Sequence, residues 1–182
     1  VQLDKGFGAG RWSPDGRKIA YTTTRENGIN LYVFDLIEGD EYTIFEEGKC
    51  PYTSFFRNIT WSPDGTKIAF RGQRRGKQTM EVAIVDARGT QHGFTTRYEA
   101  KPLYTVQWNH DGTRILFAQP TAGGSRVQLF WVDVNDDKPP ELLPGQDATR
   151  GNSNGIISPD GKRMLMVSRK PVVELAKDKA KK

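Results

Sequence analysis

The chain has 182 residues, of which 36% are hydrophobic and 10% aromatic, so it can bury a core and is too apolar for a disordered chain. No apolar run approaches the roughly 18 residues that a membrane-spanning helix needs, and the single cysteine, Cys50, excludes an internal disulfide and a cysteine-based metal cluster. The formal net charge of +5 favours acidic partners in a general way, although four lysines among the last six residues carry much of it.

A repeat of near-constant period organises the sequence. A hexapeptide ending in glycine recurs at intervals of 49, 47 and 49 residues. Its four forms are Arg-Trp-Ser-Pro-Asp-Gly, Thr-Trp-Ser-Pro-Asp-Gly, Gln-Trp-Asn-His-Asp-Gly and Ile-Ile-Ser-Pro-Asp-Gly, and they end at Gly16, Gly65, Gly112 and Gly161. Several short strands in a unit of this length are typical of β-propeller blades.

The repeat predicts the same strands in each unit, in the same order. The first strand holds the tryptophan. The second follows the glycine, at 17–21, 66–70, 113–117 and 162–166. The third is an apolar run closed by aspartate, at 31–35, 82–86 and 129–133, and the fourth is a weaker strand, at 42–45, 93–95 and 141–143. The last unit has only the first two strands and is therefore incomplete.

Turn chemistry explains the hexapeptide. Proline presets φ at the second position of a type I turn, glycine accepts a positive φ, and serine and aspartate bond nearby backbone groups. The repeated aspartates therefore have a local structural role and are not taken as catalytic: Asp15, Asp35, Asp64, Asp86, Asp111, Asp133 and Asp160. We expect Trp12, Trp61 and Trp108 to fill the wedge between radially packed sheets instead of binding a ligand.

Over residues 8–168 the sequence resembles the TolB-like β-propeller repeat, a WD40-like module with this Trp-Ser-Pro-Asp-Gly motif followed by a basic residue and an Ile-Ala-Phe strand. The third unit departs from the pattern at Asn109-His110, and the fourth lacks the tryptophan. The resemblance implies an all-β fold, a propeller of four-stranded antiparallel blades. We expect blade units at 8–48, 57–97, 104–145 and 153–170 and a lysine-rich tail at 171–182.

Three closures are open for such a chain. We favour its being part of a larger, six- to eight-bladed propeller, because its first residues fall at a blade junction. Alternatively, Val1–Leu3 and Val172–Leu175 could close a four-bladed ring, or two copies could form an eight-bladed ring. Incomplete rings expose sheet edges and apolar blade faces.

The resemblance also implies a function. TolB proteins are protein-binding partners in envelope assemblies, so we expect a non-catalytic scaffold or binding subunit in a larger complex, without a cofactor. The same repeats occur in propeller domains attached to serine peptidases, and an accessory propeller of a hydrolase is the alternative. The resemblance favours a periplasmic or cell-envelope location, with a cytoplasmic one open.

One face of the predicted propeller has the composition of a protein interface. Propeller geometry places the hexapeptide turns on one face, and the loops between second and third strands and the links between blades on the other. Exposed aromatic residues beside arginines are typical of interface hot spots. The candidate partner-binding residues on this second face are Tyr52, Phe55, Phe56, Arg57, Arg74, Arg75, Lys77, Tyr98 and Tyr104. Alternatively, Phe55 and Phe56 plug gaps between blades and the arginines are solvated.

Other functions find less support. The basic loop at 71–77 and the lysine tail could bind an anionic ligand or nucleic acid, but no recognised nucleic-acid motif accompanies them. Gly151–Gly155 matches Gly-x-Ser-x-Gly, yet a strand follows it and no histidine does, so it is not a nucleophile elbow. His92 and His110 lie in different units. We therefore predict no catalytic residue and no metal ligand.

Overall fold

The structure, a computed structural model, describes residues 10–56, 59–121, 124 and 126–170. These residues form antiparallel sheets and a single short 3₁₀ turn, Thr90–His92. Within this part of the chain, no helix is long and apolar enough to cross a membrane. The predicted lysine tail, the residues 1–3 and 172–175 that could close a ring, and Arg57 all lie outside the described residues.

Four sheets follow one another along the chain, each from one repeat. The first joins β1 (Gly10–Trp12), β2 (Lys18–Arg25), β3 (Gly28–Asp35) and β4 (Glu41–Thr43). The second joins β5 (Tyr52–Phe55), β6 (Thr60–Trp61), β7 (Lys67–Arg74), β8 (Met80–Asp86) and β9 (Phe94–Ala100), with β5 and β6 both paired to β7. The third joins β10 (Tyr104–Trp108), β11 (Arg114–Pro120), β12 (Val127–Asp133) and β13 (Glu141–Leu142), and the fourth joins β14 (Gly151–Ile157) and β15 (Met164–Arg169).

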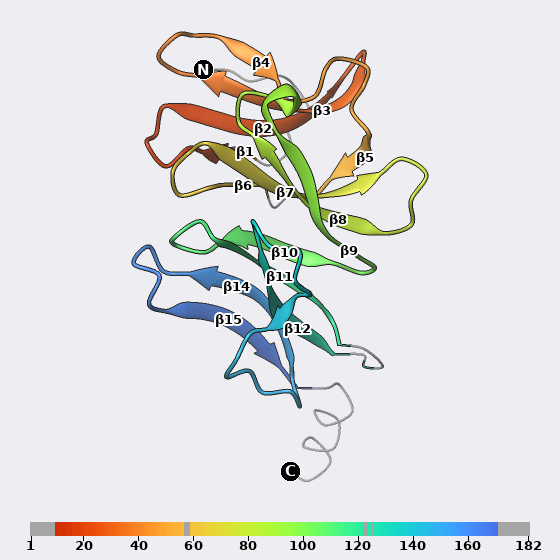
Figure 1. Ribbon diagram of the computed structural model, residues 1–182, viewed down its shortest axis with the longest axis vertical. Helices are drawn as coiled ribbons and strands as arrows, with labels where there is room; N and C mark the ends of the chain where they lie inside the picture. The colour runs from red at the N-terminus through yellow and green to blue at the C-terminus, as the bar shows by residue number, and fades with distance from the viewer. Residues whose placement is uncertain (1–9, 57–58, 122–123, 125, 171–182) are drawn as a thin grey trace, which may run out of the picture.

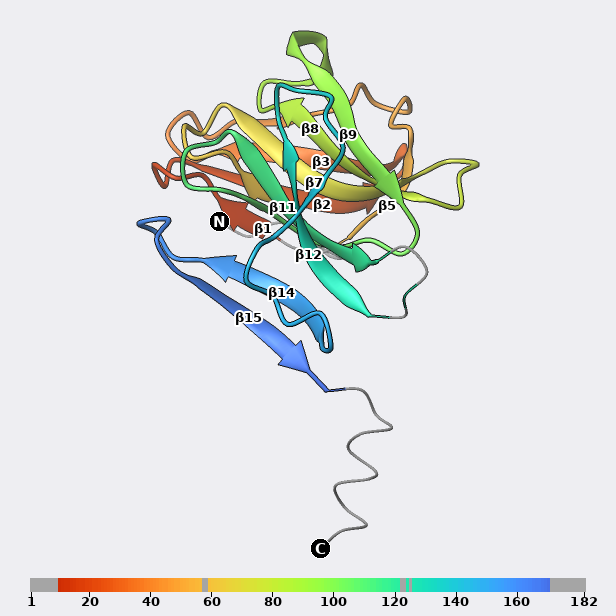
Figure 2. The same ribbon diagram turned by 60° about the horizontal axis from the view of Figure 1, so that its bottom comes forward.

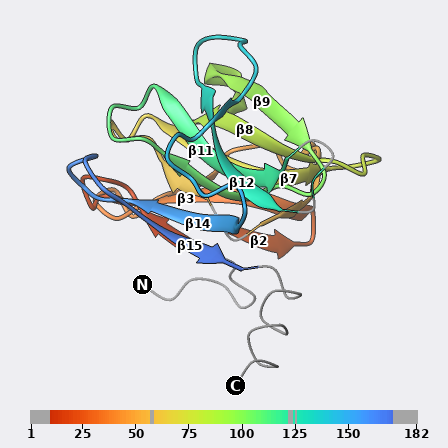
Figure 3. The same ribbon diagram turned by 90° about the horizontal axis from the view of Figure 1, so that it is seen from below.

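The sheets stack face to face in chain order (Figure 1), and the sheet β14–β15 lies next to β11 and β12 at one end of the stack (Figures 2 and 3). In the first, third and fourth sheets neighbouring strands are consecutive in the sequence, which is the order of a propeller blade. In the second sheet β5 and β6 both pair with β7, and β7, β8 and β9 follow in sequence order. The predicted fold class is therefore confirmed: an all-β fold of four-stranded antiparallel blades with an incomplete last unit.

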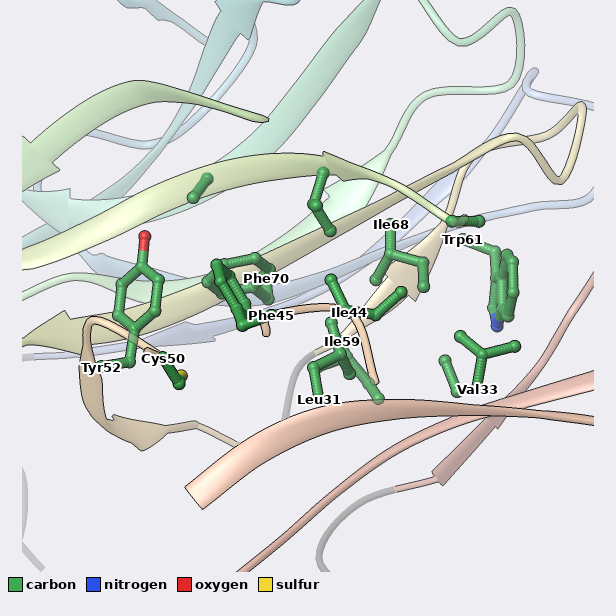
Figure 4. Packing of buried hydrophobic residues seen from close by; sticks show 14 residues of the cluster. Leu31, Val33, Ile44, Phe45, Cys50, Tyr52, Ile59, Trp61, Ile68 and Phe70 are labelled. Carbon is green, nitrogen blue, oxygen red and sulfur yellow. The ribbon is translucent and has the colours of Figure 1, made fainter. Parts of the chain in front are cut away.

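The core lies between the sheets. Leu31 and Val33 of β3 point toward Ile68 and Phe70 of β7 in Figure 4, and all four side chains are buried. Alternate residues of the same strands face the next sheet, so Ala69 packs with the second cluster. Central strands are thus covered on both faces, which is why their sequences are continuous apolar runs instead of alternating ones.

The motif tryptophans pack as predicted in two of three sheets. Trp61 and Trp108 are 7% and 5% exposed, whereas Trp12 is 61% exposed. Each buried tryptophan lies against the preceding sheet. Trp12 belongs to the first sheet and has no preceding sheet among the described residues, so the expectation that it fills a wedge fails in this chain. At the opposite end of the stack, Leu165 of β15 is 73% exposed.

The four hexapeptide turns gather on one side of the stack, at the left in Figure 1, which we call the turn face. Each turn contacts the next: a Cβ added at Gly65 would lie 3.7 Å from Pro14 Cδ, and one at Gly112 would lie 3.4 Å from Pro63 Cδ. The opposite side, with the β7–β8 loop at the right in Figure 1, is the link face. The predicted separation of turns from loops and links is therefore present.

The fourth strands differ most from their predicted bounds. β9 runs from Phe94 to Ala100, well beyond the predicted 93–95, because Met80 to Val85 of β8 give it a long partner. β4 ends at Thr43, since Ile44 and Phe45 turn into the core between the first two sheets. Outer strands have weak sequence patterns because they are only partly buried.

Candidate functional site

Two features could bind a partner or ligand: the predicted aromatic and basic residues of the link face, and a pocket along the inner strands. The nine predicted residues do not form one surface. Tyr52 is fully buried, and its hydroxyl donates a 2.8 Å hydrogen bond to Oε2 of Glu81. Burial, together with this bond to a carboxylate, raises the pKa of Tyr52. Tyr52 is therefore a structural residue and cannot contact a partner.

Glu81 organises a buried polar network in the second sheet. Its side chain is 1% exposed and accepts two hydrogen bonds from Arg74, at 2.7 Å from Nε and 2.9 Å from Nη2. Thr96 donates to it at 3.1 Å. Burial raises the pKa of Glu81, but the hydrogen bonds from Arg74 and Tyr52 outweigh that effect and hold the pKa at about 2. Glu81 is therefore ionised, and it neutralises the predicted contact residue Arg74.

Two further aromatic residues pack inside the protein. Phe55 is half-buried, and its ring lies 5.3 Å from that of Tyr52 and 5.1 Å from that of Phe70, centroid to centroid, against the core between the first two sheets. Tyr98 is half-buried, and its hydroxyl donates to Oε1 of Gln119 at 2.9 Å. The gap-plugging alternative therefore fits Phe55, and Tyr52 and Tyr98 also have structural contacts inside the protein.

The remaining described residues lie on the link face with a residue that was not among the nine, Arg71. Its guanidinium stands 4.4 Å from the centre of the Phe56 ring, and Nη1 donates to the carbonyl of Leu103 at 2.6 Å. Tyr104 follows Leu103 and is 40% exposed. We call the set Phe56, Arg71, Arg75, Lys77 and Tyr104 the link-face surface.

The charges of this surface are unequally satisfied. Lys77 donates to Glu99 at 2.7 Å and also lies 3.5 Å from Glu81. Arg75 is exposed, and its side chain has no ion-pair partner among the described residues. Arg71 is half-buried and likewise unpaired within the described ranges, with Nε lacking any hydrogen bond. Burial lowers the pKa of Arg71, because the cation is withdrawn from water.

A pocket of about 420 Å³ lies along the inner strands of all four sheets. Arg11 of β1, Thr60 of β6, Gln107 of β10 and Ile156 of β14 contribute to its wall. Sequence reasoning missed this site. The available signal was the residue before the motif tryptophan, which is polar in three successive repeats: Arg11, Thr60 and Gln107. Neighbouring strand residues point to opposite sides of a sheet, so a polar residue beside a tryptophan that is expected in the core indicates a solvent-facing position.

The Gly-x-Ser-x-Gly segment and the metal-binding side chains complete the description of candidate sites. Gly151–Gly155 lies within the strand β14 and has no helix after it among the described residues. No group of three or more His, Cys, Asp or Glu residues that could hold a metal ion occurs within the part of the chain that the structure describes.

A model of the TolB β-propeller domain family matches residues 9–181. Among solved structures, the chain is similar to TolB from Acinetobacter baumannii, with a TM-score of 0.70 and 21% identity over 91% of this chain and 38% of that one. It is also similar to oligogalacturonate lyase from Vibrio parahaemolyticus (TM-score 0.71, 17% identity, 93% of this chain and 49% of that one). A further similar structure is the β-propeller domain of the Trilobed protease from Pyrococcus furiosus (TM-score 0.64, 20% identity, 92% and 50%).

The chain spans half or less of the length of these three structures. At such identities the likeness establishes the fold and does not extend to activity. No curated protein matches the chain.

Proposed function

The chain belongs to the TolB β-propeller domain family. We propose that it is a non-catalytic binding module that holds a protein partner at its link-face surface. In this proposal the module is a scaffold in a larger assembly. Its location is the periplasm or cell envelope, as the family resemblance implies.

The observation that carries the proposal is the position of Arg71. Its guanidinium lies between Phe56 of the second blade and the backbone of Leu103 in the third, beside the exposed ring of Tyr104. A half-buried cation without a carboxylate partner is costly, so an acidic group on a partner would gain by pairing with it. Arginine and tyrosine are also the residues most enriched at interface hot spots.

The rim of the surface supports an acidic partner. Arg75 adds an exposed positive charge, and Lys77 adds a second that is shared with Glu99. Complementary charge mainly speeds association and makes it sensitive to salt. Because Arg74 is neutralised by Glu81, the loop offers fewer free cations than its sequence implies, which weakens the nucleic-acid alternative.

The proposal excludes catalysis on the grounds of chemistry. His92 lies in the 3₁₀ turn of the second unit and His110 in the hexapeptide turn of the third, and Gly151–Gly155 lies within the strand β14, whereas a nucleophile elbow joins a strand to a helix. An accessory propeller of a peptidase remains the second candidate, because the chain is similar to the propeller domain of the Trilobed protease. In that case the link-face surface would dock a catalytic domain.

Charge reversal tests the proposal. Proteins captured by the immobilised chain from extracts of the source cells are identified, and the affinity of each is measured at several salt concentrations. The double variant Arg75→Glu/Lys77→Glu and the variant Tyr104→Ala should each weaken binding at least tenfold. The matched control is Lys162→Glu/Arg163→Glu, which reverses two exposed charges near the turn face and should leave binding unchanged. Equal loss in both double variants, or in neither, would refute the proposal.

A further inference from the structure

The pocket along the inner strands presents hydrogen-bond donors. Gln107 uses its acceptor internally, since Oε1 accepts from the backbone N–H of Ile157 at 3.3 Å. Asn154 does the same, since Oδ1 accepts from the hydroxyl of Thr105 at 3.4 Å. The NH₂ groups of both amides have no hydrogen-bond partner among the described residues. Each amide therefore offers the pocket two donors, while its oxygen already accepts one hydrogen bond within the protein.

Arg11 supplies a positive charge to the same pocket. Its side chain is exposed and donates only to the carbonyl of Gly10, at 2.9 Å. Within the described part of the chain it has no ion-pair partner, and no described carboxylate lines the pocket. A cation and several donors, with no carboxylate among the described lining residues, favour an anionic, oxygen-rich ligand.

The backbone at the pocket is held in an unusual conformation. Thr105 and Asn154 have φ values of 46° and 53°, in the left-handed region. They occupy equivalent places, three residues before Trp108 and Ile157, and each lies where the register of its inner strand shifts. A β-branched residue avoids this region, and bulges of this kind often redirect side chains near binding sites. The same strained turn in two adjacent sheets therefore aims Thr105 and Asn154 at a common space.

We propose that this pocket binds a carboxylate group, with Arg11 as its ion-pair partner and the amides of Gln107 and Asn154 as flanking donors. A volume of about 420 Å³ suits a small organic acid or the carboxylate-bearing end of a peptide. The site is distinct from the link-face surface and does not depend on the proposed function. A free acid and a chain end share the recognising chemistry, so the experiment must separate them.

Nuclear magnetic resonance titration of the isotopically labelled chain distinguishes a free organic acid from the C-terminal carboxylate of a peptide as the ligand. The probes are tricarballylate, as a free acid, and the peptide acetyl-Gly-Gly-Ala with either a free or an amidated C-terminus. Saturable shifts of the side-chain amides of Gln107 and Asn154 and of Arg11 Nε are expected with a carboxylate probe. Tighter binding of tricarballylate identifies a free acid, and tighter binding of the free-carboxyl peptide identifies a chain end. The amidated peptide should not bind.

Two variants and a control complete the test. Arg11→Gln removes the charge but keeps the backbone carbonyl, and should weaken binding at least tenfold. Gln107→Glu replaces a donor by a carboxylate and should abolish binding by repulsion. Arg17→Gln, on the turn face, should bind as the unmodified chain does. The absence of saturable shifts with both carboxylate probes, or equal affinity of Arg11→Gln and the unmodified chain, would overturn the proposal.

Discussion

Trp61 Nε1 donates a 2.9 Å hydrogen bond to the carbonyl oxygen of Arg11, the residue before Trp12. The next blade repeats the contact, since Trp108 Nε1 donates at 3.2 Å to the carbonyl of Thr60, the residue before Trp61. Trp61 and Trp108 thus each fill the gap to the preceding sheet and bond the same backbone position there. The repeat therefore fixes the register between blades as well as the turn within each blade.

This relationship predicts unequal effects of the same substitution. Trp61→Ala should lower the free energy of unfolding by about 3–5 kcal/mol, because it leaves a cavity between two sheets. Trp12→Ala should cost less than about 1 kcal/mol, since that side chain is 61% exposed. Urea denaturation followed by fluorescence of the remaining tryptophans measures both. Similar costs for the two variants would show that the indole-to-carbonyl contact does not stabilise the stack.

The Glu81 network predicts a dependence of stability on pH. The pKa of Glu81 is about 2 in the folded chain and 4.5 for an ordinary glutamate. A lowered pKa stabilises the fold above pH 4.5, and that contribution is lost as the pH falls toward 2. The shift corresponds to a contribution on the order of 3 kcal/mol at neutral pH.

Glu81→Gln should therefore destabilise the chain strongly at pH 7 and much less near pH 2, because it leaves Arg74 without its counter-charge. Glu46→Gln is the control, since Glu46 pairs only with Lys49 at the surface. Thermal unfolding across this pH range measures both variants. A constant difference in stability between Glu81→Gln and the unmodified chain would contradict the assigned pKa.

The hydrogen bonds of the turn at Asn109 predict that serine can replace this asparagine with little loss of stability. In the first repeat, Ser13 Oγ accepts from the N–H of Lys18 at 2.8 Å and donates to Asp15 at 2.6 Å. Asn109 makes the equivalent bonds with its amide, accepting from the N–H of Arg114 at 2.9 Å and donating to Asp111 at 2.7 Å. Asn109→Ser should therefore change stability by less than about 0.5 kcal/mol, whereas Asn109→Ala should cost about 1–2 kcal/mol. Calorimetry tests this ranking, which would fail if alanine were tolerated as well as serine.

Substitutions at two equivalent glycines distinguish the cost of backbone strain from the cost of steric crowding. Gly16 and Gly161 both have φ near +70°, but a Cβ at Gly16 meets nothing within 4 Å, and one at Gly161 would lie 2.6 Å from His110 Cβ. Gly16→Ala should cost about 1 kcal/mol from the positive φ alone. Gly161→Ala should cost more, and hydrogen exchange at the amides of β14 and β15 would locate the extra loss. Equal costs would mean that consecutive turns are not packed together.

The local elements and the blade order were predictable because each depends on residues close in sequence. The turn at 13–16 and the strand β2 follow from proline, glycine and a β-branched run. The roles of Tyr52 and Arg74 were not predictable, because both depend on Glu81, which pairs with them only after β5, β7 and β8 come together. The pocket was missed for the same reason: Arg11 and Gln107 come from different sheets.

Exposure was harder to predict than fold. An aromatic residue beside a basic one has the same pattern in a core and in an interface, so Phe55 and Tyr104 could not be separated by composition. In the structure Phe55 is half-buried against the core, whereas Tyr104 is 40% exposed. For Trp12 the error was the opposite one, because burial was expected and the side chain is 61% exposed. A sequence repeat predicts the same environment for every unit, whether the unit lies at the end or in the middle of the stack.

Site-specific photo-crosslinking in the source cells tests the proposed binding role most directly. A photoreactive phenylalanine analogue replaces Tyr104 on the link face or, as the control, Thr66 on the turn face, which is also exposed. The proposal predicts a discrete crosslinked protein from position 104, diminished by Arg75→Glu/Lys77→Glu, and no such product from position 66. The same products from both positions, or none from position 104, would contradict it.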